Sequence, residues 1–234
     1  MGHFLPYYIR YAAYHEFDGI WLDLEHRAMD QREVQSVLSM CHQHDIDAMV
    51  RAPTQERTKL YRYFEDGASG LLMPLVDDVQ EARAIARSVK FPPIGNRGID
   101  GAGLDADFAI DAENFTNDAN AETFVILQIE TLNALQQAEQ IAGVEGVDGI
   151  FVGPADLSLR LGLADGAPSL DEAMQLVADA AARQGKAWGT AGGGVEEWKK
   201  YRQMGAQLLI GAGDFALRDV LEGAKNSMDE ALGD

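Results

Sequence analysis

The chain contains a single cysteine, Cys41, and this scarcity excludes an internal disulfide bond. It also lacks the CxxC, HExxH and GxSxG patterns that mark common thiol, zinc and serine sites. No apolar run reaches the roughly 18 residues of a membrane-spanning helix, and the amino-terminal residues show no signal-peptide pattern. These absences predict a protein of a reducing compartment, the cytoplasm, with no membrane partner.

Positive charge is also scarce. The chain has 19 Lys and Arg against 38 Asp and Glu, which gives a formal net charge of −19 at pH 7. Such an acidic surface repels nucleic acid and anionic membranes, so neither is an expected partner. An anionic small substrate is still compatible with this charge, because a local arginine or a metal ion can reverse the field inside a pocket.

Short apolar runs alternate with amphipathic stretches along the 234 residues. The runs are typical of buried parallel strands, because they are apolar on both faces; they cover 19–24, 47–52, 69–76, 123–129, 148–153, 186–190 and 207–212. Helical patterns lie between or after them, at 30–43, 55–66, 78–89, 132–143, 169–183, 195–204 and 215–232. This β-α repetition, without a Pro/Gly/Ser linker, predicts one domain over residues 1–234.

Eight such repeats would form a (β/α)8 TIM barrel of about 250 residues. A helical pattern at 5–16 precedes the first visible strand, and only residues 1–4 are available for a strand before it. We therefore expect a (β/α)8 barrel with a truncated or missing first strand. An open doubly wound sheet is the alternative. The barrel is favoured because polar residues recur where several strands end, which is where barrel enzymes hold their chemistry. The long segment 91–121 is irregular, with a helix expected at about 106–119.

The first visible strand places Trp21, Asp23 and Glu25 on one face by period-two alternation. Carboxylates are unsuited to the face that contacts the outer helices, so this face should point into the barrel or its mouth. His26 follows directly. Asp23 could fix the tautomer of this imidazole and raise its basicity, as a general base requires. A polar cluster that only caps the strand explains the same residues equally well.

Further polar residues end other strands. Arg51 ends the second visible strand, where it either pairs with an acidic side chain or binds an anionic ligand. Gln128 and Glu130 share a face at the end of the 123–129 strand, and Asp156 follows the next strand. Oxygen ligands of this kind favour Mg²⁺ or Mn²⁺. Alternatively, Asp156 only caps a helix that begins near Leu157.

The lysines argue against one kind of chemistry. A Schiff-base aldolase needs a buried lysine at the catalytic face. None of the six lysines follows the carboxyl end of a predicted strand; they are Lys59, Lys90, Lys186, Lys199, Lys200 and Lys225.

Several segments resemble the HpcH/HpaI aldolase family, the metal-dependent 2-keto-3-deoxy acid aldolases of the phosphoenolpyruvate/pyruvate superfamily. The resemblance runs from about Leu5 to about Ala224. Its most specific part is the pair QIET and GPADLS at their mutual spacing. The densest segments are FDGIWLDLEH (17–26), VRAP (50–53), GASGLLMPLVDDVQEA (67–82), FPPIGNRG (91–98), VILQIET (125–131), VEGVDGIFVGPADLS (144–158) and GAQLLIGAGDF (205–215).

The resemblance implies a site for a metal ion and a 2-oxo acid. Glu130 and Asp156 would hold a divalent cation, Mg²⁺, Mn²⁺ or Co²⁺. The backbone N–H groups of Ala155 and Asp156 would bind the carboxylate of pyruvate or another 2-oxo acid. Gln128 would support the metal site or its waters.

The resemblance also implies an activity, the cleavage or formation of a 4-hydroxy-2-oxo acid to or from pyruvate and an aldehyde. Arg51 would hydrogen-bond the keto oxygen, and His26, oriented by Asp23, would move the proton. Glu25 matches the family motif without an assigned role. Two alternatives remain open: decarboxylation of oxaloacetate at the same site, and a barrel that binds a 2-oxo acid with impaired catalysis.

Members of the family assemble as hexamers, trimers of dimers in which the last helix packs on a neighbour. The resemblance therefore implies a homo-oligomer of this type. Residues of about 215–232 would form the helix that contacts the neighbouring protomer.

Overall fold

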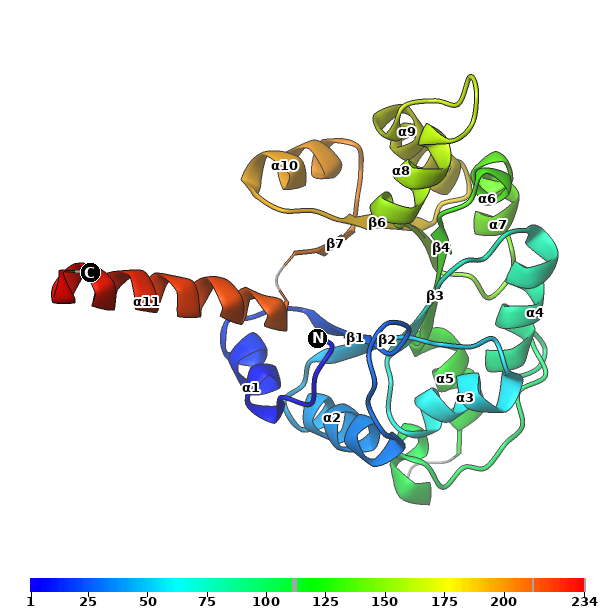
Figure 1. Cartoon of the computed structure of the whole chain (residues 1–234). Coiled ribbons are helices and arrows are strands. Elements are labelled where there is room, and N and C mark those ends of the chain that lie inside the picture. The colour runs from blue at the N-terminus through cyan, green and yellow to red at the C-terminus, as the bar shows by residue number, and fades with distance from the viewer. Residues whose placement is uncertain (111–112, 212, 234) are drawn as a thin grey trace.

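Seven parallel strands form one sheet that curls into a nearly closed barrel (Figure 1). This arrangement is seen in a computed structural model that describes residues 1–110, 113–211 and 213–233. Each strand pairs with the next in chain order. A doubly wound sheet would reverse its strand order, so the barrel prediction is confirmed. The strands are β1 Gly19–Asp23, β2 Asp47–Arg51, β3 Gly70–Met73, β4 Phe124–Ile129, β5 Gly149–Val152, β6 Ala187–Ala191 and β7 Leu208–Ile210.

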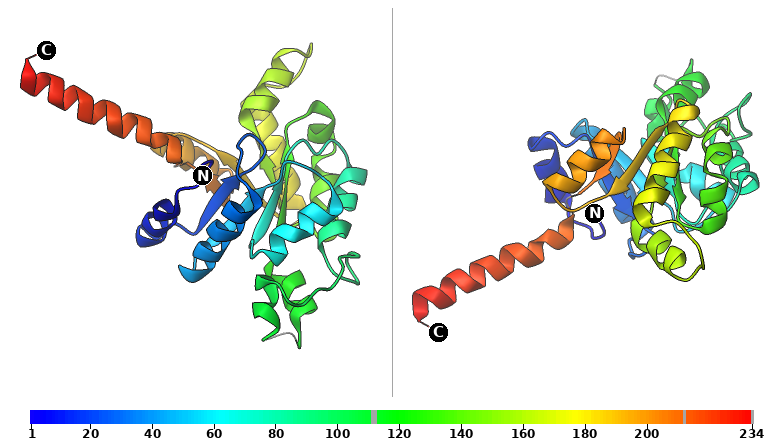
Figure 2. Two further views of the ribbon diagram at one scale, coloured as in Figure 1. Left: turned by 60° about the horizontal axis from the view of Figure 1, so that its bottom comes forward. Right: turned by 90° about the horizontal axis from the view of Figure 1, so that it is seen from above.

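Helices surround the strands on the outside of the barrel (Figures 1 and 2). Asp30 caps α2 as expected: its side chain accepts from the backbone N–H of Glu33 in a capping box. The helices are α1 Pro6–Tyr14, α2 Gln31–Gln43, α3 Arg57–Glu65, α4 Val79–Val89, α5 Phe115–Glu122, α6 Leu132–Gln136, α7 Ala138–Ala142, α8 Pro154–Gly162, α9 Leu170–Arg183, α10 Val195–Gln203 and α11 Leu217–Leu232. Two 3₁₀ helices, η1 Leu104–Ala109 and η2 Asp214–Ala216, complete the order.

Two helix predictions were wrong in detail. The helix expected at about 106–119 is instead η1 followed by α5, and η1 is itself broken by Asp107 and Phe108, whose φ angles are 44° and 54°. Residues 111–112 of that prediction lie outside the described residues. The single helix expected at 132–143 is divided into α6 and α7 at Gln137, whose backbone leaves the helical region.

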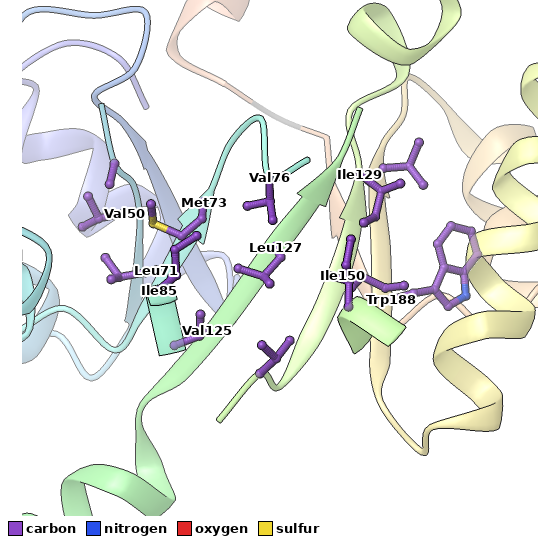
Figure 3. Close-up of a cluster of buried hydrophobic side chains, with 14 of the residues drawn as sticks. Val50, Leu71, Met73, Val76, Ile85, Val125, Leu127, Ile129, Ile150 and Trp188 are labelled. Atoms are coloured by element: carbon purple, nitrogen blue, oxygen red, sulfur yellow. The ribbon is translucent and has the colours of Figure 1, made fainter. Parts of the chain in front are cut away.

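The core has two layers, one on each face of the curled sheet. Between strands and helices lies the larger layer, part of which appears in Figure 3 with Val50, Leu71, Leu127 and Ile150. The barrel interior holds a smaller cluster, which consists of Met49, Leu72, Ile126 and Phe151 with Trp21 packed against it. The predicted alternation in β1 is therefore confirmed for Trp21, which faces inward.

The barrel has a seam between β7 and β1, which are not hydrogen-bonded to each other. Met1 lies in this position beside β1: its backbone nitrogen donates to Trp21 O (2.6 Å), and its carbonyl accepts from the Asp23 N–H (3.0 Å). These two bonds follow the pattern of a parallel ladder. Asp214 joins this segment to the end of β7, because its Oδ2 accepts from the backbone N–H groups of Gly2 and His3, both at 3.0 Å. At the position of the expected first strand, the described residues contribute one paired residue, Met1.

The last helix, α11, projects away from the barrel as an arm (Figure 2). None of its described residues is buried. Large apolar side chains are exposed along it, at Leu217, Val220, Leu221, Met228 and Leu232. Among the residues that the structure describes, no helix is both long and apolar enough to cross a membrane.

Candidate active site

The carboxyl ends of β1 and β2 place Asp23 directly beside Arg51, its partner in the strand register. Asp23 Oδ1 accepts from Arg51 Nε at 3.0 Å, and Oδ2 accepts from Nη2 at 2.8 Å. The guanidinium also lies over the Trp21 ring, 4.7 Å from its centre. Arg51 is therefore paired with a carboxylate, and this pair fixes the direction of its remaining N–H groups.

Glu25 is the second acidic partner of Arg51. Its Oε2 lies 3.1 Å from Arg51 Nη1 and 3.5 Å from Nε2 of His26, whose side chain is 55% exposed. Asp23 contacts the backbone of this turn instead, since its Oδ1 accepts from the N–H groups of Glu25 (3.1 Å) and His26 (3.3 Å). The structure thus brings the predicted His26, Asp23 and Arg51 together, with Glu25 facing the imidazole.

The charged form of Asp23 is favoured in spite of its burial. Burial opposes the charged form, but the hydrogen bonds and the positive charge of Arg51, together with the two backbone N–H groups, outweigh it. The pKa of Asp23 therefore lies below its ordinary value.

Glu130 follows β4 directly and is only 3% exposed. Its Oε1 accepts from the backbone N–H of Leu75 at 2.9 Å. Leu75 has a φ of 53°, an uncommon left-handed conformation for a leucine. Burial raises the pKa of Glu130; the negative charges of Asp156 and Glu25 add to this rise, while the Leu75 bond and Arg51 oppose it. A cation at this carboxylate would relieve that cost.

Gly153 allows the backbone after β5 to approach the side chains of β4. A Cβ atom at this position would lie 2.5 Å from Glu130 Oε2 and 3.1 Å from Gln128 Nε2. Gln128 is 1% exposed, and its Oε1 has no hydrogen-bond partner among the described residues. An amide oxygen left unpaired in the interior is costly, so this atom is suited to a ligand.

Ala155 and Asp156 lie in the first turn of α8, which begins at Pro154. The interpretation of Asp156 as the cap of a helix near Leu157 was therefore wrong, since the helix begins three residues earlier. The Asp156 side chain is 47% exposed, and Oδ1 accepts from Arg160 Nη1 at 2.9 Å. Backbone N–H groups in a first helical turn have no intrahelical partners, so they can bind an anion.

These donors fit a hard divalent cation. Glu130, Asp156 and the unpaired oxygen of Gln128 all offer oxygen, which Mg²⁺ and Mn²⁺ prefer. Across the described ranges, no group of three or more His, Cys, Asp or Glu side chains is arranged to hold a metal.

A cavity of about 780 Å³ runs along the seam between β7 and β1. Asp23 and Arg51 line it together with apolar groups such as Trp21, Leu209 and Tyr8. Glu130 and Asp156 lie outside this lining. The cavity therefore gives access to the Arg51 side of the site.

Sequence reasoning missed two contributors. Leu75 acts through its backbone N–H, and no side-chain pattern could reveal it. Arg160 holds Asp156 from four residues further along the same helix, and this i,i+4 spacing was a usable signal.

Sequence comparison finds related enzymes over most of the chain. Residues 3–216 match the family HpcH/HpaI aldolase/citrate lyase. A 4-hydroxy-2-oxovalerate aldolase of Rhodococcus jostii (strain RHA1) is 36% identical over 197 residues, which are 82% of this chain and 75% of the relative. A hydroxypyruvate/pyruvate aldolase of Pseudomonas aeruginosa is 33% identical over 216 residues, which are 91% of this chain and 80% of the relative.

Structural comparison agrees. The crystal structure of an HpcH/HpaI aldolase from Desulfitobacterium hafniense DCB-2 matches with a TM-score of 0.89 and 29% identity, covering 97% of this chain and 90% of that one. The resemblance seen in the sequence motifs is thereby confirmed. The chain belongs to the HpcH/HpaI aldolase/citrate lyase family of enzymes.

Proposed function

We propose that this chain is a divalent-metal-dependent aldolase that cleaves or forms a 4-hydroxy-2-oxo acid, with pyruvate and an aldehyde as the other side of the reaction. The observation that carries the proposal is the buried Glu130 carboxylate, which Gly153 brings close to the backbone after β5 and to the buried side chain of Gln128. The name of the 4-hydroxy-2-oxovalerate aldolase relative supports the same reaction type.

Binding of the 2-oxo acid uses groups from three strand ends. A divalent cation held by Glu130 and Asp156, with Gln128 beside it, would supply Lewis-acid polarisation of the substrate. The N–H groups of Ala155 and Asp156 bind the substrate carboxylate. Arg51 donates to the keto oxygen and stabilises the negative charge that develops there.

His26 accepts the proton of the C4 hydroxyl group. The C3–C4 bond breaks, its electron pair forms the pyruvate enolate, and the aldehyde leaves. Protonation at C3 then gives pyruvate. Asp23 positions Arg51 through two hydrogen bonds and holds the turn that carries His26.

The test combines the purified protein with Mg²⁺, Mn²⁺ or Co²⁺, pyruvate and a panel of hydroxyaldehydes, with adducts detected by NMR. We expect adduct formation that Glu130→Ala abolishes. Glu139→Ala is the matched control, because that carboxylate pairs with Arg183 on the outer surface. Consumption of oxaloacetate without any aldol reaction would favour the decarboxylase alternative. Binding of pyruvate without turnover would favour the impaired barrel, and no dependence on Glu130 would contradict the proposal.

The assembly and the location belong to the same proposal. We infer one barrel domain over residues 1–234, a cytoplasmic location and a hexamer built as a trimer of dimers, in which α11 packs on a neighbouring copy. The exposed apolar side chains of α11 support this assembly, since they have no partner within the described chain.

A further inference from the structure

The loop between β3 and α4 touches the proposed metal site through its backbone. Leu75, two residues after β3, donates its N–H to Glu130 Oε1 at 2.9 Å. Its φ of 53° lies in the left-handed region, which is sterically unfavourable for a leucine. Leu75 is 45% exposed, so packing of its own side chain does not account for this conformation. The contacts of the neighbouring residues therefore have to hold it.

Asp77 links this loop to the residues that follow Glu130. Its Oδ1 accepts from Thr131 Oγ1 at 2.5 Å, and its Oδ2 accepts from Asn133 Nδ2 at 3.0 Å. The bonds from Thr131 and Asn133 hold the pKa of Asp77 below its ordinary value, so the charged form of this carboxylate is favoured. The two loops are thus joined twice, by Leu75 with Glu130 and by Asp77 with Thr131.

The neighbours of Asp77 make their contacts elsewhere. Asp78 caps α4, because its Oδ1 accepts from the N–H groups of Gln80 and Glu81 at 2.7 Å and 2.9 Å. Val76 is fully buried in the core layer shown in Figure 3. Within the described chain, Asp77 therefore supplies the side chain of this loop that hydrogen-bonds to residues after β4.

We propose that Asp77 is a positioning residue of the metal site. Through Thr131 and Asn133 it holds the loop in the conformation that directs the Leu75 N–H at Glu130. This N–H engages Oε1 and fixes the orientation of the carboxylate, so Glu130 is preset as a ligand before a cation binds. Outer contacts of metal ligands typically contribute about 10–100-fold to metal affinity. The inference rests on the metal dependence of the proposed function.

The first test is hydrogen exchange of the Leu75 amide, followed by NMR in the full chain without metal. We expect this amide to exchange about tenfold faster in Asp77→Ala than in the wild type, because one average hydrogen bond corresponds to about this factor in a local opening equilibrium. Asp77→Asn keeps an oxygen for the Thr131 hydroxyl and should retain most of the protection. Unchanged exchange of Leu75 in Asp77→Ala overturns the inference.

The second test is the affinity for Mn²⁺, measured by calorimetry. We expect a loss of about tenfold in Asp77→Ala and a smaller loss in Asp77→Asn. Asp78→Ala is the matched control, because it removes the cap of α4 from the same loop and leaves the bond to Thr131 intact. It should lower the melting temperature without changing the Mn²⁺ affinity. The same result for Asp77→Ala would show a role confined to stability and would overturn the inference.

A substitution at Leu75 separates positioning from a general loss of structure. Glycine adopts the left-handed region without steric cost, so Leu75→Gly reduces the need for an outside hold. We expect the double variant Leu75→Gly and Asp77→Ala to recover part of the Mn²⁺ affinity that Asp77→Ala loses. A double variant that binds Mn²⁺ no more tightly than Asp77→Ala contradicts the route through Leu75.

Circular dichroism establishes that each variant is folded. Thr131→Val removes the same bond from the other side and gives the reading if Asp77→Ala is unfolded. The exchange measurement needs no metal, so the two proposals fail in different ways. A wild-type protein that binds no Mn²⁺ contradicts the proposed function, while the exchange of Leu75 still decides what Asp77 holds. Metal-dependent aldolase activity with unchanged Leu75 exchange in Asp77→Ala overturns the role of Asp77 alone.

Discussion

Gly153 lies so close to Glu130 that a single added carbon atom would disturb the proposed metal site. Gly153→Ala would place its Cβ 2.5 Å from Glu130 Oε2 and displace that carboxylate. Disturbing the surroundings of metal ligands typically costs about 10–100-fold in affinity. We expect a loss of this size in Mn²⁺ binding, measured by calorimetry.

Gly162→Ala is the control for this substitution, because it lies at the other end of α8 with no atom within 4 Å of its added Cβ. Equal Mn²⁺ affinity in the two variants would contradict the placement of the metal at Glu130.

The buried carboxylate of Glu130 leads to a prediction about how metal binding and pH together change the free energy of unfolding. Burial raises its pKa in the folded protein, so its contribution favours folding at low pH and is lost as the pH rises through the folded pKa. Above that pKa the ionised carboxylate is a cost that a cation offsets. We expect Mn²⁺ at 100 times its Kd to add about 2.7 kcal/mol to the free energy of unfolding, and the gain to shrink as the pH is lowered through the folded pKa.

Thermal melts with and without Mn²⁺ across this pH range provide the measurement. Glu130→Gln should remove the response to Mn²⁺ while the fold stays intact. If Mn²⁺ still stabilises this variant, the ion binds at a site other than Glu130.

The candidate site shows which of its residues can be predicted from sequence patterns. Alternation and strand ends were enough to select Asp23, Arg51 and Glu130 from the sequence. Their partners were not predictable in the same way, because the contact of Glu25 with Arg51 depends on the turn that follows β1 and on the register with β2. The N–H of Leu75 depends on a left-handed backbone conformation that a leucine does not signal.

At the scale of elements, the seam between β7 and β1 depends on Asp214. Its side chain is 3% exposed, and its Oδ2 accepts from Gly2 N, His3 N and His3 Nδ1. Asp214→Ala would leave two buried or half-buried backbone donors unpaired. We expect a loss of about 2–3 kcal/mol in the free energy of unfolding, from these hydrogen bonds, measured by urea denaturation.

The pH dependence of this contact has the opposite sign from that of Glu130. Burial opposes ionisation of Asp214, but the bonds from Gly2 and His3 and the nearby amino terminus outweigh it and lower its pKa. Its contribution is present above the unfolded pKa and is lost as the pH falls through the folded pKa. Asp219→Ala, on the exposed face of α11, should leave both stability and acid sensitivity unchanged. Acid sensitivity that is the same in Asp214→Ala and the wild type would contradict this role.

The elements themselves were largely predictable. All seven apolar runs form strands, because a strand buried on both faces has a continuous apolar signature. The segment 91–121 was predicted less well, because its conformation depends on contacts made elsewhere in the fold. Arg97, for example, is buried between the rings of Phe64 and Phe91 and pairs with Asp105.

At the scale of the whole molecule, α11 is an arm whose apolar side chains lack a partner within the described chain. If it packs on a neighbouring copy, a charge on this face must weaken the assembly. We expect the double substitution Val220→Asp and Leu221→Asp to lower the mass measured by light scattering, whereas Asn226→Asp should not. A wild-type protein that is monomeric at micromolar concentration would contradict the proposed hexamer.

The repeated β-α pattern is readable from the sequence, as are the seven strands and the residues at their carboxyl ends, because strand and helix periodicities are local properties. The family membership followed from short motifs in the same way. Which groups meet is a property of the folded chain: Glu25 lies between Arg51 and His26, Gly153 lets the backbone approach Glu130, and Asp214 holds the seam. These contacts depend on strand register and loop conformation, which bring together residues far apart in the chain and leave no periodic signal in it.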